Sequence, residues 1–148
     1  MRQRGFEIVS GYYRNAIIPT RSTKNSAGYD FYAVEDIVIP EMYPTFVKTG
    51  IKAFMRNDEV LMLYNRSSNP KRRGLILANG VGVVDSDYYE NPDNEGEIMF
   101  MFINITDTPC QIKKGDKIGQ GVFTKFLKID NEELVSTERS GGFGSTGD

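Results

Sequence analysis

The run Ile98-Met99-Phe100-Met101-Phe102-Ile103 decides the fold class of this sequence. It is apolar throughout, short and rich in aromatic side chains, which favours a buried strand over a helix. The run Val60-Leu61-Met62-Leu63-Tyr64 has the same character. Both are bounded by polar residues, so we expect two strands that are buried on both faces.

Shorter strands are expected on either side of these runs. Apolar residues and a threonine alternate with lysine and glycine in residues 47–53, the period-two pattern of a single half-buried strand. Residues 37–39 form another apolar run, and turn-forming pairs such as Asn57-Asp58 and Asn79-Gly80 separate the strands. Many short strands at this spacing are typical of a sandwich, jelly roll or barrel. We expect an all-β fold, a distorted jelly roll or β-clip-like barrel.

One short helix is expected among these strands. Ser68-Asn69 can cap a helical turn that begins with Pro70 and ends at Gly74. No other segment has a helical pattern, so strands and loops should account for the rest of the chain.

Length and charge limit the classes of protein that fit. The 148 residues suffice for one domain, placed at residues 1–148. With 18 basic and 20 acidic residues, the net charge of −2 argues against nucleic-acid binding by bulk electrostatics. No apolar run is long enough for a membrane span, and the first residues lack the apolar stretch of a signal peptide. The single cysteine, Cys110, suits a reducing compartment, so a cytoplasmic location is expected.

The absence of histidine limits the chemistry. One chain has no catalytic triad that depends on histidine and no Cys/His zinc site. A general base must therefore be Asp, Glu, Lys or Tyr. Any metal should be bound through oxygen, which favours Mg²⁺.

Arg66-Ser67-Ser68 form the first candidate site. A guanidinium followed by two hydroxyls, at the end of a strand and the start of a helical turn, can bind a phosphate group. The same arrangement is equally typical of an ordinary helix cap beside a surface arginine.

Residues 79–88 form the second candidate site. Gly80 and Gly82 within an apolar stretch predict a hairpin whose backbone closely approaches another group. Asp85 and Asp87 lie on one face if the strand continues through them, as a catalytic pair of carboxylates would. Paired aspartates at a strand end more often form only a turn.

The glycine-rich residues 139–148 form the third candidate site. Glycine backbone amides, two hydroxyls and Arg139 can bind an anion, and Phe143 can stack on a base. The spacing of the glycines matches a dinucleotide fingerprint, but no helix can follow so close to residue 148. On composition alone, a mobile tail explains this segment better.

Together, and in this order, these segments resemble the five motifs of the homotrimeric dUTPase family. The motifs correspond to residues 27–33 (Ala-Gly-Tyr-Asp-Phe-Tyr-Ala), 66–68, 79–88, 115–120 (Gly-Asp-Lys-Ile-Gly-Gln) and the tail. They span nearly the whole chain. The resemblance implies a jelly roll that trimerises with shared active sites and uses Mg²⁺ to hydrolyse dUTP to dUMP and pyrophosphate.

The resemblance also implies roles for individual residues. Asp85 would be the general base that deprotonates the water attacking the α-phosphorus in line. Asp30 would act near Mg²⁺ through water, with no direct protein ligand to the metal. The residues implied to bind substrate are Arg66, Ser67, Ser68, Asn79, Val83, Val84, Tyr88, Met99, Gln120, Arg139, Phe143, Ser145 and Thr146.

The resemblance assigns different residues of this set to the phosphates, the uracil and the sugar of dUTP. Residues 66–68 and Gln120 would bind the phosphates, and Asn79 with the backbone of residues 83–84 would bind the uracil edge, near Met99. Tyr88 would pack against the deoxyribose and exclude a 2′-hydroxyl. The tail would close over the nucleotide, with Phe143 on the uracil and its arginine and hydroxyls at the γ-phosphate.

The sequence departs from the family pattern at two places. Residues 89–95 are an acidic insert before Gly96-Glu97, either a longer solvated loop or a contact surface for a regulatory protein partner. The spacing between Arg139 and Gly141 is one residue shorter than usual. Two other functions stay open: a nucleotide-gated interaction module that uses residues 89–95, and a dCTP deaminase, which shares the fold but has a signature that this chain lacks.

Overall fold

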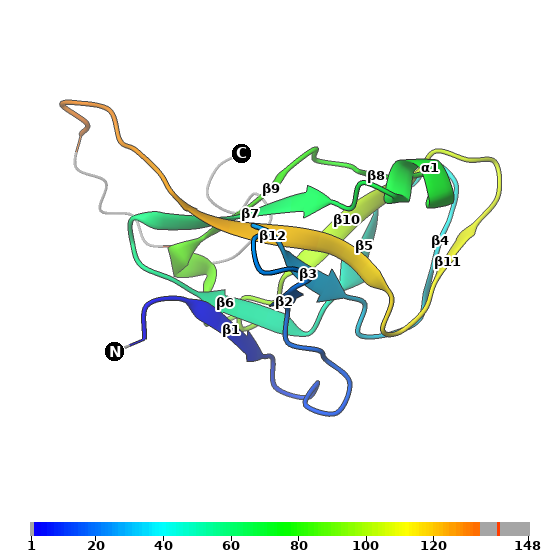
Figure 1. Ribbon diagram of the computed structural model, residues 1–148, viewed down its shortest axis with the longest axis horizontal. Helices are drawn as coiled ribbons and strands as arrows, with labels where there is room; N and C mark the ends of the chain where they lie inside the picture. The colour runs from blue at the N-terminus through cyan, green and yellow to red at the C-terminus, as the bar shows by residue number, and fades with distance from the viewer. Residues whose placement is uncertain (1, 134–138, 140–148) are drawn as a thin grey trace.

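Strand β12 lies at the centre of the larger sheet in the computed structural model, which describes residues 2–133 and 139 (Figure 1). Within these residues the sheet is antiparallel, in the order β2-β3-β12-β7-β9. Its strands are β2 (Thr20–Arg21), β3 (Tyr29–Tyr32), β7 (Glu59–Asn65), β9 (Gly82–Asp85) and β12 (Lys117–Lys125). β12 pairs with β7 along one edge and β3 along the other, so it joins segments far apart in sequence.

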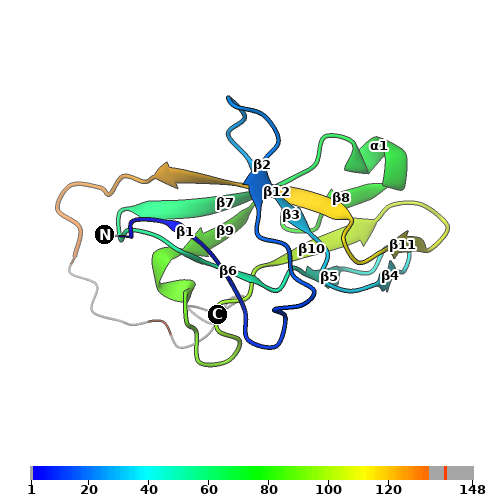
Figure 2. The ribbon, with the colours of Figure 1, turned by 60° about the horizontal axis from the view of Figure 1, so that its bottom comes forward.

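Smaller sheets complete the fold. β5 (Thr45–Lys48), β10 (Met99–Asn104) and β8 (Leu75–Leu77) form a sheet in the order β5-β10-β8. β1 (Gly5–Ile8) pairs with β6 (Ile51–Phe54), and β4 (Ile37–Ile39) pairs with β11 (Cys110–Ile112). In Figure 2, β12 and β7 run above β10 and β5. These sheets face one another across the core.

Aromatic side chains fill the space between the two larger sheets. The ring centroids of Phe31 from β3 and Phe100 from β10 are 5.4 Å apart, and Phe100 stacks on Phe102 at 6.3 Å. These three rings and Leu61 of β7 are at most 1% exposed. The expected all-β, jelly-roll-like fold is confirmed, with strands in both layers and the core between them.

The predicted helix is confirmed as α1 (Asn69–Arg73). Ser68 occupies the N-cap position, and Gly74 ends the helix in the left-handed conformation with φ of 65°. Ser68 makes no side-chain capping hydrogen bond, so the helix does not hold its hydroxyl. A 3₁₀ turn at Ser86–Tyr88, which the sequence pattern does not predict, adds a second helical segment.

The single strand predicted over residues 47–53 is wrong. The chain turns at Gly50, where φ is +68°, so β5 and β6 belong to different sheets. Thr49 is fully buried at this turn, and its hydroxyl donates to the carbonyl of Ile98 at 2.6 Å. Lys52, expected on an exposed face, is only 7% exposed. Acidic residues of the 89–95 insert pair with it, which a pattern confined to residues 47–53 cannot reveal.

The hairpin predicted in residues 79–88 is also wrong. β8 pairs with β10 whereas β9 pairs with β7, so residues 78–81 cross from one sheet to the other. β9 ends at Asp85, and the strand does not continue through Asp87. The predicted close approach of the backbone is confirmed: a Cβ at Gly82 would lie only 2.9 Å from the Leu63 side chain.

The two long apolar runs differ in how far they are buried. In β10, Phe100 and Phe102 are buried while Met99 and Met101 are half-buried, so this run is buried on one face and the prediction for it is wrong. In β7, the successive residues Val60 and Leu61 are both buried, so both faces are covered at the start of this run, whereas Tyr64 near its end is 38% exposed. The second face of β10 therefore presents a partly accessible apolar surface.

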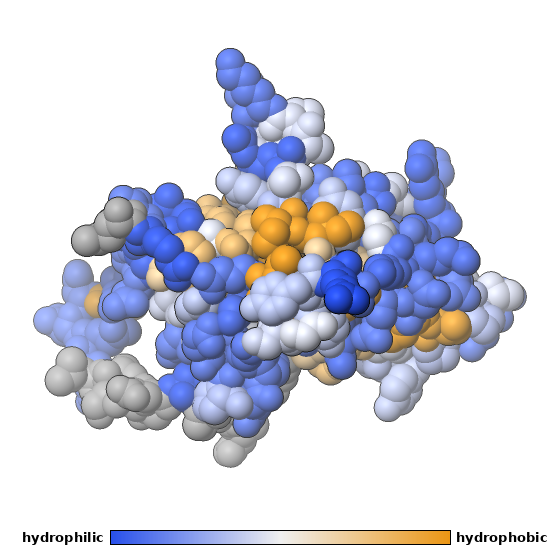
Figure 3. All heavy atoms as spheres, turned by 90° about the horizontal axis from the view of Figure 1, so that it is seen from below, coloured by the Kyte–Doolittle hydropathy of each residue, from blue (hydrophilic) through white to orange (hydrophobic). Residues whose placement is uncertain are grey.

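The face shown in Figure 3 is mainly polar, with a small apolar patch near its centre. Ile17 and Ile18 of the amino-terminal segment are among the exposed apolar side chains. Scattered apolar side chains of this kind are normal on a protein surface. No helix among residues 2–133 and 139 is long and apolar enough to cross a membrane.

Gly119 of β12 leaves room for the ring of Phe100. A Cβ at this position would overlap that ring, which is 1% exposed and tightly packed. We expect Gly119→Ala to lower the free energy of unfolding by about 1–3 kcal/mol, measured by urea denaturation. Adding Phe100→Leu removes the clashing ring atoms, so the double variant should lose less free energy of unfolding than the two single variants lose together. If the two losses of free energy simply add, the proposed contact between position 119 and the Phe100 ring is wrong.

Glu59 links the start of β7 to the amino-terminal segment. Its carboxylate accepts hydrogen bonds from Arg4 Nε at 2.8 Å and from the backbone N–H of Arg56 at 3.0 Å. The hydrogen bond from Arg4 lowers the pKa of Glu59 below its ordinary value of 4.5. The folded state therefore keeps this carboxylate ionised at a pH at which the unfolded chain protonates it.

We expect Glu59→Gln to destabilise the protein most at neutral pH. Because its folded-state pKa is depressed, the carboxylate stabilises the fold fully above 4.5 and loses this contribution as the pH falls through the folded-state pKa. Urea denaturation at about pH 7 and about pH 3 should show that the difference in free energy of unfolding between wild type and variant is smaller at the lower pH. A difference of equal size at both pH values would refute this role of the ion pair.

Candidate active site

The residues predicted to bind phosphate meet where β7 ends beside β12. Arg66 directly follows β7, and Gln120 of β12 pairs with Tyr64. The Gln120 amide donates to the carbonyl of Asn65 at 3.2 Å, and the Arg66 guanidinium donates to the carbonyl of Lys117 at 3.1 Å. Both side chains are therefore anchored at the same end of the larger sheet.

Two asparagines that the sequence reasoning missed hold this end together. The amide of Asn69, a residue only 1% exposed, donates to Asn65 Oδ1 at 2.7 Å and to the carbonyl of Ile118 at 2.9 Å. Asn65 Oδ1 also accepts the backbone N–H of Arg66 at 2.9 Å. The pair links β7, α1 and β12 around residues 66–68. The sequence signal that could have identified the pair is its spacing: the two asparagines are four residues apart and lie on either side of the Arg-Ser-Ser motif.

Asp30 belongs to the same group. It pairs with Gln120 across β3 and β12, its side chain is 16% exposed, and Oδ2 lies 3.2 Å from Lys117 Nζ. Gly28 lies under the Gln120 side chain, which a Cβ at position 28 would overlap. The segments resembling the first, second and fourth family motifs are thus brought together.

Asn79 and Met99 line the same small cavity near the crossing between β8 and β9. Leu77, Gly82 and Met101 also line it. The lining is mainly apolar, with Asn79 as its polar side chain. A few polar groups in an apolar hollow suit recognition of a planar organic ring.

Val83 and Val84 lie on opposite faces of β9. Val84 packs into the core and is 7% exposed, whereas Val83 is 61% exposed. In the part of the chain that is described, β9 is an edge strand that pairs with β7 alone. An edge strand presents backbone N–H and C=O groups that can bind another molecule.

Asp85 lies at the end of β9, directly before the 3₁₀ turn. Its side chain is 51% exposed, and Oδ2 lies 2.5 Å from Nη2 of Arg139. Arg139 Nε also lies 2.7 Å from Oδ1 of Asp87. Two residues that are 54 positions apart in sequence, Asp85 and Arg139, therefore meet. The sequence analysis paired Asp87 with Asp85 through their i, i+2 spacing, but the family resemblance gave Asp87 no role in the site.

Tyr88 closes the 3₁₀ turn and is 7% exposed. Its hydroxyl donates to the carbonyl of Glu97 at 2.7 Å and accepts a hydrogen bond from the Asn94 amide at 2.8 Å. Burial raises the pKa of Tyr88 above its ordinary value of 10.0. The phenol is therefore neutral at neutral pH and remains a hydrogen-bond donor.

Within one chain, Asp85 and Arg66 lie at opposite ends of β7. Asp85 pairs with Val60 near the start of the strand, whereas Arg66 follows its last residue. The strand between them extends about 20 Å, given a rise of roughly 3.3 Å per residue. A general base must lie about 3 Å from the proton that it takes, directly or through one water. Asp85 therefore cannot act on a phosphate bound at Arg66 of the same chain.

Part of the predicted site lies outside the described residues, namely Phe143, Ser145 and Thr146. Among residues 2–133 and 139, no group of three or more Asp, Glu, His or Cys side chains could hold a metal ion. Asp30 and Asp85 supply carboxylate oxygens, the donor type that Mg²⁺ prefers.

Known protein sequences provide an independent comparison. The dUTPase family model matches residues 14–147. A deoxyuridine 5′-triphosphate nucleotidohydrolase of Lactococcus lactis is 50% identical over 149 residues, which cover 99% of this chain and 99% of the relative. The enzyme of the same name from Helicobacter pylori strain Shi470 is 36% identical over 137 residues, which cover 90% of each chain.

Solved structures agree with the sequence comparisons. The crystal structure of dUTPase from Streptococcus mutans has a TM-score of 0.83 and 45% identity, and the match covers 86% of this chain and 99% of that chain. The dUTPase from phage phi11 of S. aureus, at 20% identity, shares the fold with a TM-score of 0.75 over 93% of this chain and 99% of that chain. Since the family model spans most of the sequence and a full-length relative is 50% identical, this chain belongs to the dUTPase family, the enzymes that hydrolyse dUTP to dUMP.

Proposed function

We propose that Asp85 is the general base of this dUTPase and deprotonates the water that attacks the α-phosphorus of dUTP in line. The observation that carries this proposal is the contact of Asp85 with Arg139, which brings together residues of two family-like motifs. A carboxylate is the expected base in a chain without histidine. The water oxygen bonds to the α-phosphorus, Asp85 takes its proton, and pyrophosphate leaves as the bond to the β-phosphate breaks.

The triphosphate is bound at the end of β7 in this proposal. Arg66, Ser67 and Ser68 contact the α- and β-phosphates, and Gln120 joins the network of phosphates and water. Support comes from the asparagine-centred hydrogen bonds that fix Arg66, and from the Ser68 hydroxyl, which makes no capping bond. A pre-positioned guanidinium binds phosphate without having to be ordered first.

The uracil is bound on the β9 side. Asn79 and the backbone of Val83 and Val84 contact its edge, with Met99 beside it. Support comes from the cavity that Asn79 and Met99 share and from the edge position of β9. A methyl group in a soft apolar pocket changes binding by only about 1–3 kcal/mol. A closely approaching backbone is therefore a better barrier to the 5-methyl group of thymine.

The tail completes the site. Arg139 moves from the two aspartates to the γ-phosphate when nucleotide binds, which frees Asp85 to accept a proton. Phe143 then covers the uracil, and Ser145 and Thr146 contact the γ-phosphate. Closure of such a segment excludes bulk water and adds positive charge where pyrophosphate departs.

Mg²⁺ is the proposed cofactor. When bound with the triphosphate, the ion would supply positive charge against the negative charge that builds up on the departing pyrophosphate. The donor set fits this ion, because the nearby side-chain oxygens are carboxylates. Asp30 is only 16% exposed and is paired with Lys117, which suits a contact with the ion through water rather than a direct bond.

The proposed assembly is a homotrimer whose active sites are shared between subunits. The separation of about 20 Å between Asp85 and Arg66 along β7 supports a site built from more than one copy. The half-buried Met99 and Met101, together with the exposed Phe46 and Ile76, form apolar surface that another copy can cover.

Two further assignments belong to this proposal. Residues 1–148 form one domain, whose residues 139–148 are the closing tail. The free thiol of Cys110 suits a reducing cytoplasm, where we place the enzyme.

The other two functions considered from the sequence are not favoured. Both the family model and the relatives are dUTP hydrolases, not deaminases. Two of the three carboxylates in the insert, those of Glu90 and Glu95, pair with Lys52 of the same chain, so the acidic character of the insert has a role within the fold.

We expect Asp85→Asn to lower kcat for dUTP by about 10²–10⁴-fold, because an amide cannot take a proton from water. Pyrophosphate release with Mg²⁺ measures this, with dTTP, dCTP and UTP as competing substrates that wild type should hydrolyse poorly. The matched control is Asp87→Asn, which removes the other carboxylate at Arg139 and should change kcat by less than about tenfold. Equal losses in both variants would contradict the assignment of Asp85 as the base.

Mixed oligomers test whether sites are shared. Asp85→Asn and Arg66→Ala should each be inactive alone. When the two variants are co-expressed and mixed trimers are isolated through different tags, roughly a third of the sites should combine an intact Asp85 from one subunit with an intact Arg66 from another. Recovered dUTP hydrolysis is the expected result. Mixed oligomers no more active than their parents would show that each chain supplies both residues to its own site.

A further inference from the structure

The acidic insert, residues 89–95, forms a compact loop. The N–H of Glu90 donates to the carbonyl of Glu95 at 2.9 Å, and the N–H of Glu95 donates to the carbonyl of Asn91 at 2.7 Å. Glu90 and Glu95 both have φ of 61°, a left-handed conformation uncommon outside glycine. Asn91 is only 4% exposed. A loop with two such residues must be held in shape by its surroundings.

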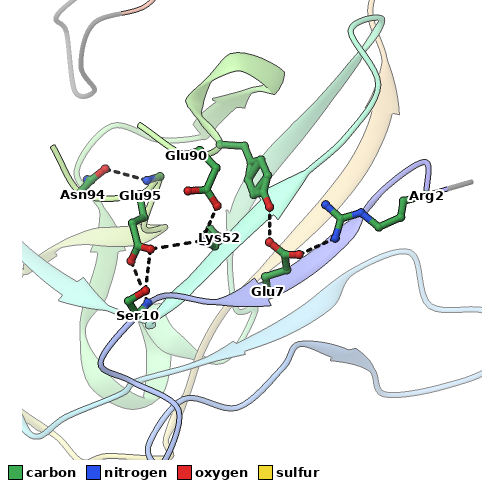
Figure 4. A network of polar contacts seen from close by, with 9 residues as sticks. Arg2, Glu7, Ser10, Lys52, Glu90, Asn94 and Glu95 are labelled. Atoms are coloured by element: carbon green, nitrogen blue, oxygen red, sulfur yellow. Dashed lines mark hydrogen bonds and ion pairs between the residues drawn. The ribbon is translucent and has the colours of Figure 1, made fainter. Parts of the chain in front are cut away.

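Contacts with the amino-terminal part of the chain hold this loop. Glu95 accepts hydrogen bonds from the N–H and the hydroxyl of Ser10, at 2.8 and 2.9 Å (Figure 4). Lys52 Nζ lies 2.6 Å from Glu90 and 3.5 Å from Glu95, and its side chain is 9% exposed. The hydrogen bonds from Ser10 also lower the pKa of Glu95, so this carboxylate is ionised at neutral pH. The loop is therefore anchored to the body of the protein.

The anchored loop in turn contacts Tyr88. The Asn94 amide donates to the Tyr88 hydroxyl at 2.8 Å, while Asn94 Oδ1 accepts the N–H of Gly96 at 3.0 Å. The Tyr88 hydroxyl donates its own proton to the carbonyl of Glu97 at 2.7 Å. Asn94 thus joins the loop, the following turn and the far end of the Tyr88 ring.

We propose that Asn94 is a positioning residue for substrate specificity: it fixes the Tyr88 ring and thereby strengthens the discrimination of deoxyribose from ribose. The inference rests on the proposed function, in which Tyr88 packs against the sugar. It gives the insert a role inside the enzyme, through a residue that lies within the departure from the family pattern.

The physical reason is that contacts at both ends of the ring restrict its orientation. Tyr88 is attached to the backbone at one end and hydrogen-bonded at its hydroxyl at the other, so the ring is held at both ends. A 2′-hydroxyl on the sugar needs the ring to tilt away. If the hydroxyl loses its donor from Asn94, the ring can tilt more easily and make room for a 2′-hydroxyl. Because catalysis depends on placing the substrate to within less than an ångström, a looser ring should lower the preference for dUTP over UTP.

The experiment compares kcat/KM for dUTP and for UTP in wild type, Asn94→Asp, Tyr88→Phe and the double variant. Asn94→Asp keeps an oxygen for the N–H of Gly96 but has no amide to donate to Tyr88. Because its carboxylate can instead accept the proton of the Tyr88 hydroxyl, the shorter Asn94→Ser, which withdraws the amide without adding a carboxylate, is measured beside it. Tyr88→Phe keeps the ring and removes the hydroxyl. The variant at Asn94 should lower the dUTP-to-UTP preference by about five- to tenfold, the effect of one net hydrogen bond. Tyr88→Phe should lower it by at least as much, because it also removes the hydrogen bond to the carbonyl of Glu97.

The double variant tests whether Asn94 acts through Tyr88. If it does, adding Asn94→Asp to Tyr88→Phe should produce no further loss of preference, because the shared hydrogen bond is already absent. The matched control is Asp93→Asn, at an exposed position of the same loop, which should leave the preference within about twofold of wild type. Thermal unfolding of each variant confirms that it is folded.

Several results would overturn the inference. The wild-type preference in both Asn94→Asp and Asn94→Ser, or losses that add in the double variant, would show that Asn94 does not act through the Tyr88 hydroxyl. If Asn94→Asp does not fold, the comparison rests on Asn94→Ser, which withdraws the amide without adding a charge. If Asp93→Asn also lowers the dUTP-to-UTP preference, the loss comes from disturbing the loop as a whole and not from the contact between Asn94 and Tyr88. A wild-type enzyme without activity on dUTP would instead refute the proposed function, and the role of Tyr88 with it.

Discussion

The hydrogen bonds between β12 and β7 are the interaction on which the rest of the structure depends. Their register places Gln120 opposite Tyr64 and therefore beside the Arg-Ser-Ser segment that follows β7. On its other edge, β12 holds β3 and brings Asp30 to the same place. Because side chains alternate between the faces of a strand, a slip of one residue would turn every one of these groups to the wrong face. Glycine at 119 and 121 permits this arrangement, since Phe100 and Phe31 occupy the space that larger side chains would need.

The strand that brings Arg66 to Gln120 also separates this group from Asp85. Residues 66–68 follow one end of β7, and Asp85 pairs with Val60 near the other end. The length of the strand, about 20 Å between these points, is the physical reason for proposing a site that is shared between copies of the chain. Arg139 lies against Asp85 and Asp87 in the described chain. In the proposed function these ion pairs break when Arg139 contacts phosphate, and Asp85 is then free to accept a proton.

Sequence patterns predicted the local elements well and their partners poorly. The turn at α1 followed from Pro70 and Gly74, and the strands at Phe100 and Leu61 followed from their apolar runs. The alternation in residues 47–53 gave no sign that Gly50 would divide the run between two sheets. The pairing of Lys52 with Glu90 was equally invisible, because it joins residues that are 38 positions apart. Asn69 was read as part of a helix cap, whereas the folded chain uses its buried amide to join β7 to β12.

The sequence by itself identified the family through five ordered motifs, and the absence of histidine limited the possible general bases to Asp, Glu, Lys and Tyr. It also located the helical turn at α1 and the strands β7 and β10, since those depend on neighbouring residues. Only the tertiary structure decided which strands pair, which residues meet and which lie too far apart to act in one chain. It also decided that the acidic insert binds Ser10 and Lys52 and places Asn94 on Tyr88. The reason is that periodicity reports burial along one segment, whereas contacts between segments depend on register and crossing, which no local pattern contains.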